Sequence, residues 1–163
     1  MWWSEEEWST LHDPEHCGMC ADAHVDENPH SLLVASTVTT HLRMARNQAH
    51  RGYCIVILRD HLTDLAELRP DQLSSFWSDV QRAGRAIGAT FDPRKIDYLV
   101  MGHRMPHLHC HLLPQHVGDD PLRNVDISDG PELPPLAALR RDVRSLRARW
   151  NDLTSDELLP PRT

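Results

Sequence analysis

The sequence predicts an α+β domain, in which a long helix and a C-terminal helix accompany an antiparallel sheet of about five strands. Two observations carry this prediction. In residues 107–113 histidine alternates with apolar residues, which is typical of a strand with one polar and one apolar face. After residue 70, apolar residues recur every three or four positions for more than three helical turns. A chain of 163 residues can bury a sizeable core as one domain.

The first half of the chain contains a possible short helix and two predicted strands. Ser4 and Glu7 form a capping box, which predicts one or two helical turns within residues 1–13. Residues 31–36 favour a short strand. Residues 38–50 give a weak helical pattern that ends near a turn. The wholly apolar segment 54–58 is typical of a buried strand.

The clearest helix begins at Pro70, which suits a first-turn position, and Asp71 complements the positive end of the helix. Its apolar stripe is expected to face the core and ends near Gly88. The stripe consists of Leu73, Phe76, Trp77, Val80, Ala83 and Ile87. Residues 95–101 alternate like a strand, and residues 102–106 turn the chain into the histidine strand.

Beyond residue 121 a segment rich in Pro, Asp and Gly favours a loop, and an amphipathic C-terminal helix follows it. The helix is marked by Leu136, Leu139, Val143, Leu146 and Trp150. We therefore expect four parts: an N-terminal extension (1–14), a core (15–120), a loop with the C-terminal helix (121–150) and a tail (151–163).

Composition excludes several classes of partner. The net charge of −7 makes a long nucleic acid an unexpected partner. No apolar run approaches about 20 residues, so no transmembrane helix is expected. The acidic N-terminus lacks the features of a signal peptide, which predicts a cytoplasmic protein with reduced cysteines.

The histidine strand is the main candidate for chemistry. On a strand, His107, His109 and His111 point to one side at intervals of about 6.6 Å. Imidazole can act near neutral pH as a nucleophile, a general acid or a metal ligand. The residues alone leave open whether all three histidines bind one zinc ion in a metallohydrolase. Farther upstream, Cys17 and Cys20 form a Cys-x-x-Cys pair, which indicates zinc, a redox pair or coincidence.

Residues 107–113 resemble the His-φ-His-φ-His-φ-φ pattern, with φ apolar, of the histidine-triad (HIT) superfamily of nucleotide hydrolases and transferases. Residues 114–119 resemble the segment that follows the triad in the dinucleoside-polyphosphate hydrolase branch, except that Gln115 stands where Arg is usual. The family usually has a Gly-His pair before the strand at 54–58, where this chain has Gly52 and Tyr53. The resemblance implies a HIT-like fold and a homodimer.

The resemblance also implies roles for individual residues. His109 would attack the α-phosphorus of a nucleotide, and His111 would orient the site and bind phosphate. We expect His103, Arg104 and Gln115 to contact substrate, with Arg104 suited to a bidentate phosphate contact. No organic cofactor is expected.

Several HIT proteins carry an early Cys-x-x-Cys, a histidine after a mid-chain strand and a metal-binding first histidine of the triad. By this resemblance Cys17, Cys20, His61 and His107 would bind a structural zinc ion, which would be tetrahedral and closed. Other histidines remain as substitute ligands, namely His16, His24, His41 and His50.

The expected function is hydrolysis of a dinucleoside polyphosphate, a nucleoside phosphoramidate or a similar conjugate. The reaction would pass through a nucleotidyl-histidine and release a nucleoside monophosphate. One alternative is a nucleotidyltransferase or phosphorylase that uses the same intermediate. Another is a zinc-stabilised nucleotide-binding module with little turnover.

Overall fold

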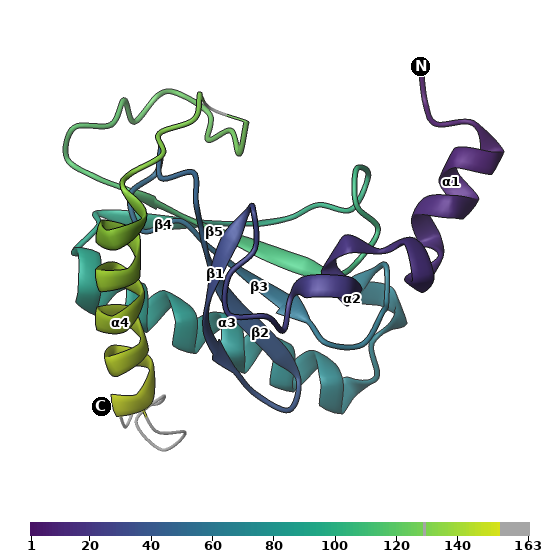
Figure 1. The fold of residues 1–163 in the computed structure, drawn as a ribbon, viewed down its shortest axis with the longest axis horizontal. Helices are drawn as coiled ribbons and strands as arrows, with labels where there is room; N and C mark the ends of the chain where they lie inside the picture. The colour runs from purple at the N-terminus through teal and green to yellow at the C-terminus, as the bar shows by residue number, and fades with distance from the viewer. Residues whose placement is uncertain (129, 154–163) are drawn as a thin grey trace.

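The computed structural model describes residues 1–128 and 130–153, and five antiparallel strands form its centre (Figure 1). The sheet order is β1-β2-β3-β5-β4. The strands are β1 (Ser31–Ser36), β2 (Thr40–Ala45), β3 (Cys54–Leu58), β4 (Lys95–Val100) and β5 (His109–Gln115). The helices are α1 (Glu5–His12), α2 (Gly18–Asp22), α3 (Pro70–Phe91) and α4 (Leu136–Asp152), with short 3₁₀ turns at Pro14–His16 and Leu65–Glu67. The predicted α+β architecture is confirmed.

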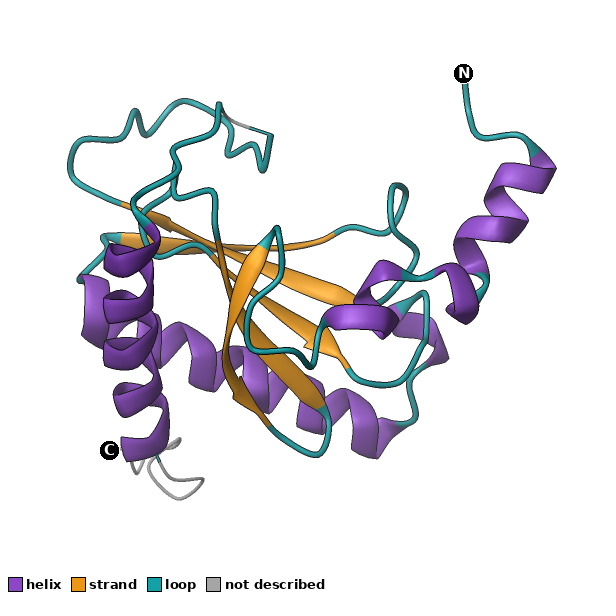
Figure 2. Ribbon diagram, in the orientation of Figure 1, coloured by secondary structure: helices purple, strands orange, loops and turns teal. Residues whose placement is uncertain are grey.

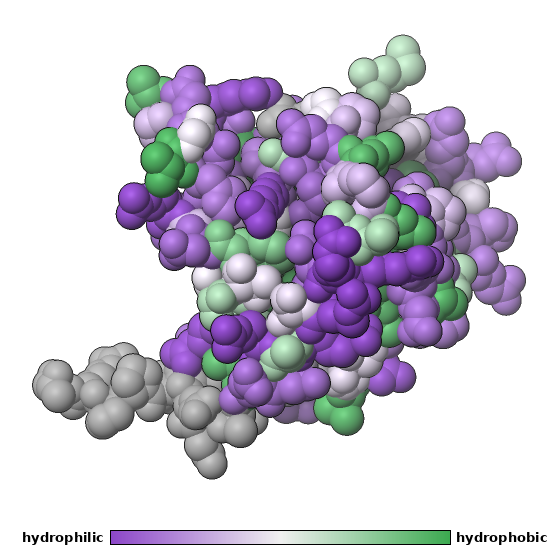
Figure 3. Space-filling model, turned by 60° about the vertical axis from the view of Figure 1, so that its left-hand side comes forward, coloured by the Kyte–Doolittle hydropathy of each residue, from purple (hydrophilic) through white to green (hydrophobic). Residues whose placement is uncertain are grey.

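Helix α3 runs across one face of the sheet, and α4 lies beside it (Figure 2). Pro70 stands in the first turn with Asp71, as predicted, and the helix continues three residues beyond Gly88 to Phe91. Its buried residues pack with Leu139, Val143, Leu146 and Trp150 of α4 and with one side of the sheet. The polar side of α4 remains outside, and the face drawn in Figure 3 is mostly hydrophilic with hydrophobic residues in small groups.

The prediction of a weak helix over residues 38–50 is wrong, because residues 40–45 form strand β2. The pattern was misleading because every residue of this strand is buried. Leu42 and Met44 join the core beneath the helices. Arg43 points to the other side, where residues 23–31 cover it and bind its guanidinium. Residues 41–44 do alternate between polar and apolar side chains, but the run is short and its polar side is buried instead of facing solvent.

The N-terminal extension packs at the edge of the molecule near the start of the histidine strand, where Trp3 contacts His103 and Cys17 contacts His107. The predicted capping box is present, because Ser4 Oγ accepts from the Glu7 amide and the Glu7 carboxylate accepts from the Ser4 amide. Helix α1 has no buried residue. Among the described residues, no helix combines the length and the apolar character that crossing a bilayer requires. The tail expected over 151–163 falls mostly outside the described part of the chain, and α4 extends to Asp152.

Candidate functional site

Strand β5 carries two of the three triad histidines and lies between β3 and β4. Leu108, Cys110 and Leu112 join the core beneath the helices. His109 and His111 alternate with them and therefore lie on the opposite face of the sheet. Both are buried, with 4% and 6% of their surface exposed. The predicted alternation is confirmed, although the strand begins at His109, two residues later than the start of the pattern.

A chain of close polar contacts connects the triad. His109 Nδ1 lies 2.6 Å from the carbonyl oxygen of His107, so this nitrogen carries a proton and donates it. The other nitrogen of His109, Nε2, lies 3.0 Å from Nε2 of His111. His111 Nδ1 lies 2.7 Å from the hydroxyl oxygen of Tyr53. Each ring nitrogen of the pair therefore has one partner.

Burial keeps these two imidazoles neutral at pH 7. Desolvation lowers the pKa of His109, and the hydrogen bond to the His107 carbonyl opposes that change only partly. Desolvation, with a smaller contribution from the neighbouring His109, lowers the pKa of His111 to about 3. With Nδ1 protonated, neutral His109 has its lone pair on Nε2. That nitrogen has the electronic form of a nucleophile.

His109 and His111 line a cavity of about 250 Å³. His103 and Arg104, from the turn before β5, line the same cavity. The rest of its wall is mostly apolar and comprises Met19, Leu99, Met101, Met105, Val125, Asp126 and Ile127. Arg104 contributes to the lowered pKa of Asp126, after two hydrogen bonds from Ser128, so the two charged side chains lie near each other. The cavity therefore combines two side chains of opposite charge, Arg104 and Asp126, with a largely apolar wall.

Gln115 lies apart from this group. It lines a second cavity of about 550 Å³, and its Nε2 lies 3.4 Å from both His50 Nδ1 and the Leu113 carbonyl. The structure thus brings His103, Arg104, His109 and His111 together and leaves Gln115 outside the group. The N-terminal extension reaches the cavity rim, because the Trp3 indole N–H donates to the His103 carbonyl at 2.7 Å.

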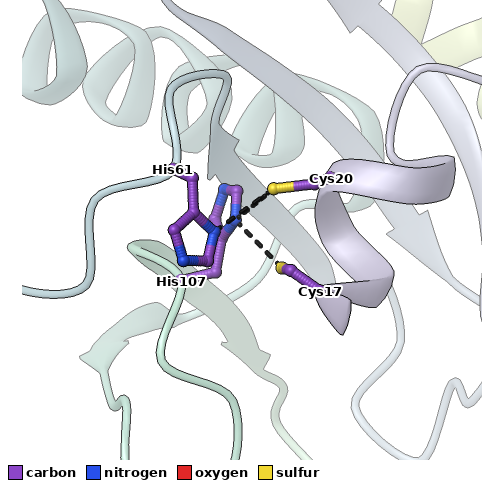
Figure 4. Close-up of side chains that lie close together, drawn as sticks. All are labelled: Cys17, Cys20, His61 and His107. Atoms are coloured by element: carbon purple, nitrogen blue, oxygen red, sulfur yellow. Dashed lines mark hydrogen bonds between the residues drawn. The ribbon is translucent and has the colours of Figure 1, made fainter. Parts of the chain in front are cut away.

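The four predicted zinc ligands form one cluster (Figure 4). Cys17 and Cys20 come from α2 and the residue before it, His61 follows β3, and His107 precedes β5. Their ligand atoms all lie within 4.8 Å of one another. Cys17 Sγ lies 3.3 Å from His107 Nδ1, and Cys20 Sγ lies 3.2 Å from His61 Nδ1 and 3.5 Å from His107 Nδ1. The substitute ligands lie outside this cluster, namely His16, His24, His41 and His50.

This cluster fits a tetrahedral zinc ion. With Zn–S near 2.3 Å and Zn–N near 2.05 Å, tetrahedral geometry puts sulfur and nitrogen ligands about 3.6 Å apart. Both histidines also present the correct nitrogen, because their Nε2 atoms contact carbonyl oxygens. His107 Nε2 lies 2.7 Å from Leu58 O, and His61 Nε2 lies 3.0 Å from His12 O. These hydrogen bonds place the proton on Nε2 and leave Nδ1 as the ligand atom. Within the described residues the cluster includes neither His109 nor His111, so one metal held by all three triad histidines is not the arrangement found.

Sequence reasoning missed two parts of the site. Tyr53, which directly precedes β3, contacts His111 through its hydroxyl. The sequence did contain a signal for this residue, because Tyr53 follows Gly52 at the position where the family usually has a histidine. The segment from Val125 to Ile127 was expected only as loop, yet it lines the triad cavity.

Comparison with known proteins supports the assignment of the fold. The HIT domain family model matches residues 25–118, which is more than half of the chain. No match to this chain was found among curated proteins. Of the solved structures, a histidine triad protein from Bradyrhizobium japonicum has 16% identity and a TM-score of 0.67, with 74% of this chain and 90% of that chain covered.

Two further structures have the same fold. A hypothetical histidine triad nucleotide-binding protein from Sulfolobus tokodaii has 15% identity and a TM-score of 0.68, covering 83% of this chain and 93% of its own. A zinc-bound histidine triad family protein from Mycobacterium smegmatis has 19% identity and a TM-score of 0.63, covering 86% and 96%. Together with the family-model match, these findings show that this chain belongs to the HIT domain family, within a superfamily of nucleotide-binding hydrolases and transferases.

Proposed function

We propose that this protein is a hydrolase that cleaves a dinucleoside polyphosphate, or a nucleoside phosphoramidate or similar conjugate, at the α-phosphorus. The observation that carries the proposal is the state of His109. Its Nδ1 donates to the His107 carbonyl, its ring is neutral, and the ring lines a cavity beside Arg104. A neutral, oriented imidazole next to a cation is suited to attack on a phosphate ester.

The first step forms a bond between Nε2 of His109 and the α-phosphorus. The bond from that phosphorus to the leaving group breaks, and the leaving group takes the bonding electron pair. A phosphate leaving group departs as an oxyanion, whereas an amine leaving group takes a proton from water. The resulting nucleotidyl-imidazolium keeps its Nδ1 proton on the His107 carbonyl, which stabilises the positive charge.

The second step is hydrolysis of this intermediate. Water attacks the α-phosphorus, the N–P bond breaks, and its electron pair returns to Nε2 of His109. One proton of the water passes to solvent, and the nucleoside monophosphate leaves. His111 donates from Nε2 to a non-bridging phosphate oxygen in both steps, and Arg104 neutralises phosphate charge. We assign His103 to contact with substrate, and Gln115 to contact with substrate portions that extend beyond the triad cavity.

Cys17, Cys20, His61 and His107 would hold a structural zinc ion. In this role the metal supplies no reaction step and joins the N-terminal segment to the start of the histidine strand. None of the four cysteines is in a disulfide, which is the usual state in a reducing compartment, and we place the protein in the cytoplasm.

We further propose a homodimer that forms along β4, an edge strand of the sheet. Apolar side chains are exposed on β4 and on neighbouring α3, namely Tyr98, Val100, Leu73 and Trp77. An edge strand that is flanked by exposed apolar residues favours pairing with a second copy. Light scattering should give twice the chain mass, and Val100→Lys should yield monomer; a monomeric parent protein would refute this proposal.

The proposed reaction is tested with labelled diadenosine polyphosphate and adenosine phosphoramidate. Quenched samples should contain an acid-labile nucleotidyl adduct on His109, and His109→Ala should lose both adduct and turnover. His16→Ala is the matched control, because this histidine is exposed and outside the cavity. Product that forms only with added phosphate or sugar phosphate would indicate a transferase. Tight nucleotide binding without adduct would indicate a binding module and refute the hydrolase.

A further inference from the structure

We infer that Tyr53 is a positioning residue, whose hydroxyl fixes the tautomer of His111 so that His111 directs an N–H group toward the bound phosphate. This inference rests on the proposed function for its kinetic consequence. The hydrogen bond and the His111 tautomer that it describes are properties of the ligand-free protein. The observation behind it is the 2.7 Å contact between the Tyr53 hydroxyl and Nδ1 of His111, in which both side chains are buried.

The chain holds Tyr53 firmly in this place. Its amide donates to the His50 carbonyl at 2.9 Å, and its carbonyl accepts from the Ala45 amide at 3.1 Å. The preceding Gly52 adopts a φ of +91°, a value that glycine tolerates, and its amide donates to the Gln48 side chain at 2.7 Å. The turn therefore delivers the tyrosine ring beside His111, with ring centroids 5.9 Å apart.

The direction of each hydrogen bond follows from the next one along the chain. His109 uses its proton on Nδ1 to bind the His107 carbonyl, so His109 Nε2 can only accept. The group 3.0 Å away, Nε2 of His111, must then be the donor. A neutral imidazole carries one proton, so Nδ1 of His111 must accept, and the tyrosine hydroxyl must donate to it. Burial raises the pKa of Tyr53, which keeps that hydroxyl protonated.

This arrangement has a chemical consequence. In the ligand-free site the Nε2–H of His111 donates a hydrogen bond to the lone pair on Nε2 of His109, the proposed nucleophile. When His109 Nε2 bonds to phosphorus, that lone pair is used, and the His111 N–H becomes available to an adjacent phosphate oxygen. Before that bond forms, the His109 lone pair and the Tyr53 hydroxyl both hold the His111 proton on Nε2. After it forms, only the hydroxyl does so; without it the proton can move to Nδ1, and Nε2 then offers the phosphate a lone pair instead of a donor. Loss of one such donor typically slows an enzyme about 10²-fold.

The test uses the chain's two tyrosines. Tyr53→Phe removes the hydroxyl and keeps the ring, and Tyr98→Phe is the same change on β4, outside the triad cavity. Long-range ¹H–¹⁵N spectra of the ligand-free protein report the tautomer of His111 directly. Because the lone pair of His109 also holds this proton on Nε2, the comparison is made in a His109→Ala background. There we expect the Nε2-protonated form with Tyr53 and with Tyr98→Phe, and a shift toward the Nδ1-protonated form with Tyr53→Phe.

Kinetics of the same tyrosine substitutions in the protein that retains His109 supply the second readout. For Tyr53→Phe we expect kcat to fall about 10–100-fold with KM within about threefold of the parent value, and for Tyr98→Phe no change beyond about twofold. An Nδ1-protonated His111 in the parent protein would overturn the inference, even if the variant does not fold. A fall in kcat with an unchanged tautomer would also overturn it, since that result indicates a packing role. Absence of turnover in the parent protein would refute the proposed function and leave the spectroscopic test intact.

Discussion

Removing zinc should detach the N-terminal segment and leave the sheet folded. The proposed ligands come from two places, because Cys17 and Cys20 belong to the segment before the sheet while His61 and His107 belong to loops of the folded body. Helices α1 and α2 contain no buried residue, and the main core begins at Leu32. Few apolar contacts therefore hold this segment once the metal bridge is broken.

The magnitude follows from binding linkage. Free zinc at 100 times its dissociation constant stabilises the folded state by about 2.7 kcal/mol. In a domain of this size that stabilisation corresponds to about 5–10 °C in Tm. Only residues up to 22 should detach, because the Arg43 guanidinium still binds the carbonyls of Ala23 and Val25. Protease cleavage is therefore expected before residue 23.

The assay combines metal analysis, thermal unfolding and limited proteolysis, with and without a chelator. Cys20→Ser should lose zinc, melt lower and be cleaved before residue 23, while its sheet spectrum persists. Burial raises the pKa of the Cys20 thiol to about 11, so zinc affinity should also weaken as pH falls. Cys110→Ala removes a buried thiol outside the cluster and should retain zinc. A zinc-free protein that resists both heat and protease as well as the untreated sample would refute the reasoning.

Four further substitutions test backbone conformation, packing and burial in the folded body. Gly52→Ala should lower the free energy of unfolding by about 2–3 kcal/mol in a urea titration, because φ is +91° and the new Cβ would lie 2.7 Å from the Phe91 ring. Gly88→Ala, where a Cβ meets nothing within 4 Å, should be neutral or stabilising. Arg43→Met should cost about 2–4 kcal/mol in the same titration, since it removes the donor from buried carbonyls. Burial, and to a smaller extent repulsion by nearby cations, lowers the pKa of His41 to about 4 in the folded protein. As the pH falls, the unfolded chain therefore binds a proton at this histidine before the folded protein does. The free energy of unfolding should then decrease between about pH 6.5 and pH 4. His41→Gln should reduce this loss by up to about 3 kcal/mol, and identical pH profiles of stability would contradict the assignment.

The sequence predicted those elements whose residues alternate between core and solvent or follow a helical repeat. Helix α3 and strand β5 have such patterns, and both were placed to within a few residues. Strand β2 alternates only over residues 41–44, and its polar side is covered as well, which buries Arg43 as completely as Met44. A buried arginine that is satisfied by carbonyl groups looks, in a sequence, the same as an arginine in water. Only the three-dimensional cover distinguishes them.

The candidate site was likewise predictable only in part. Histidine and cysteine are common metal ligands and nucleophiles, so the zinc cluster and the two cavity histidines could be predicted from spacing and resemblance. The contact of Tyr53 with His111 depends on strand register, since β3 lies beside β5 and places residues 53 and 111 together. Gln115 illustrates the converse, because its neighbourhood in sequence to the triad did not bring it into the triad cavity.

His107 links the metal cluster to the proposed nucleophile by two separate atoms. Its Nδ1 belongs to the cluster, whereas its backbone carbonyl accepts the proton of His109. A side-chain substitution removes the first function and retains the second, because every residue has a carbonyl group. His107→Asn should therefore lose zinc yet keep a protonated Nδ1 on His109, as ¹⁵N spectra would reveal. If the His109 tautomer changes together with the metal, the strand start depends on zinc for its shape, and the metal is then required for the nucleophile as well as for holding the N-terminal segment.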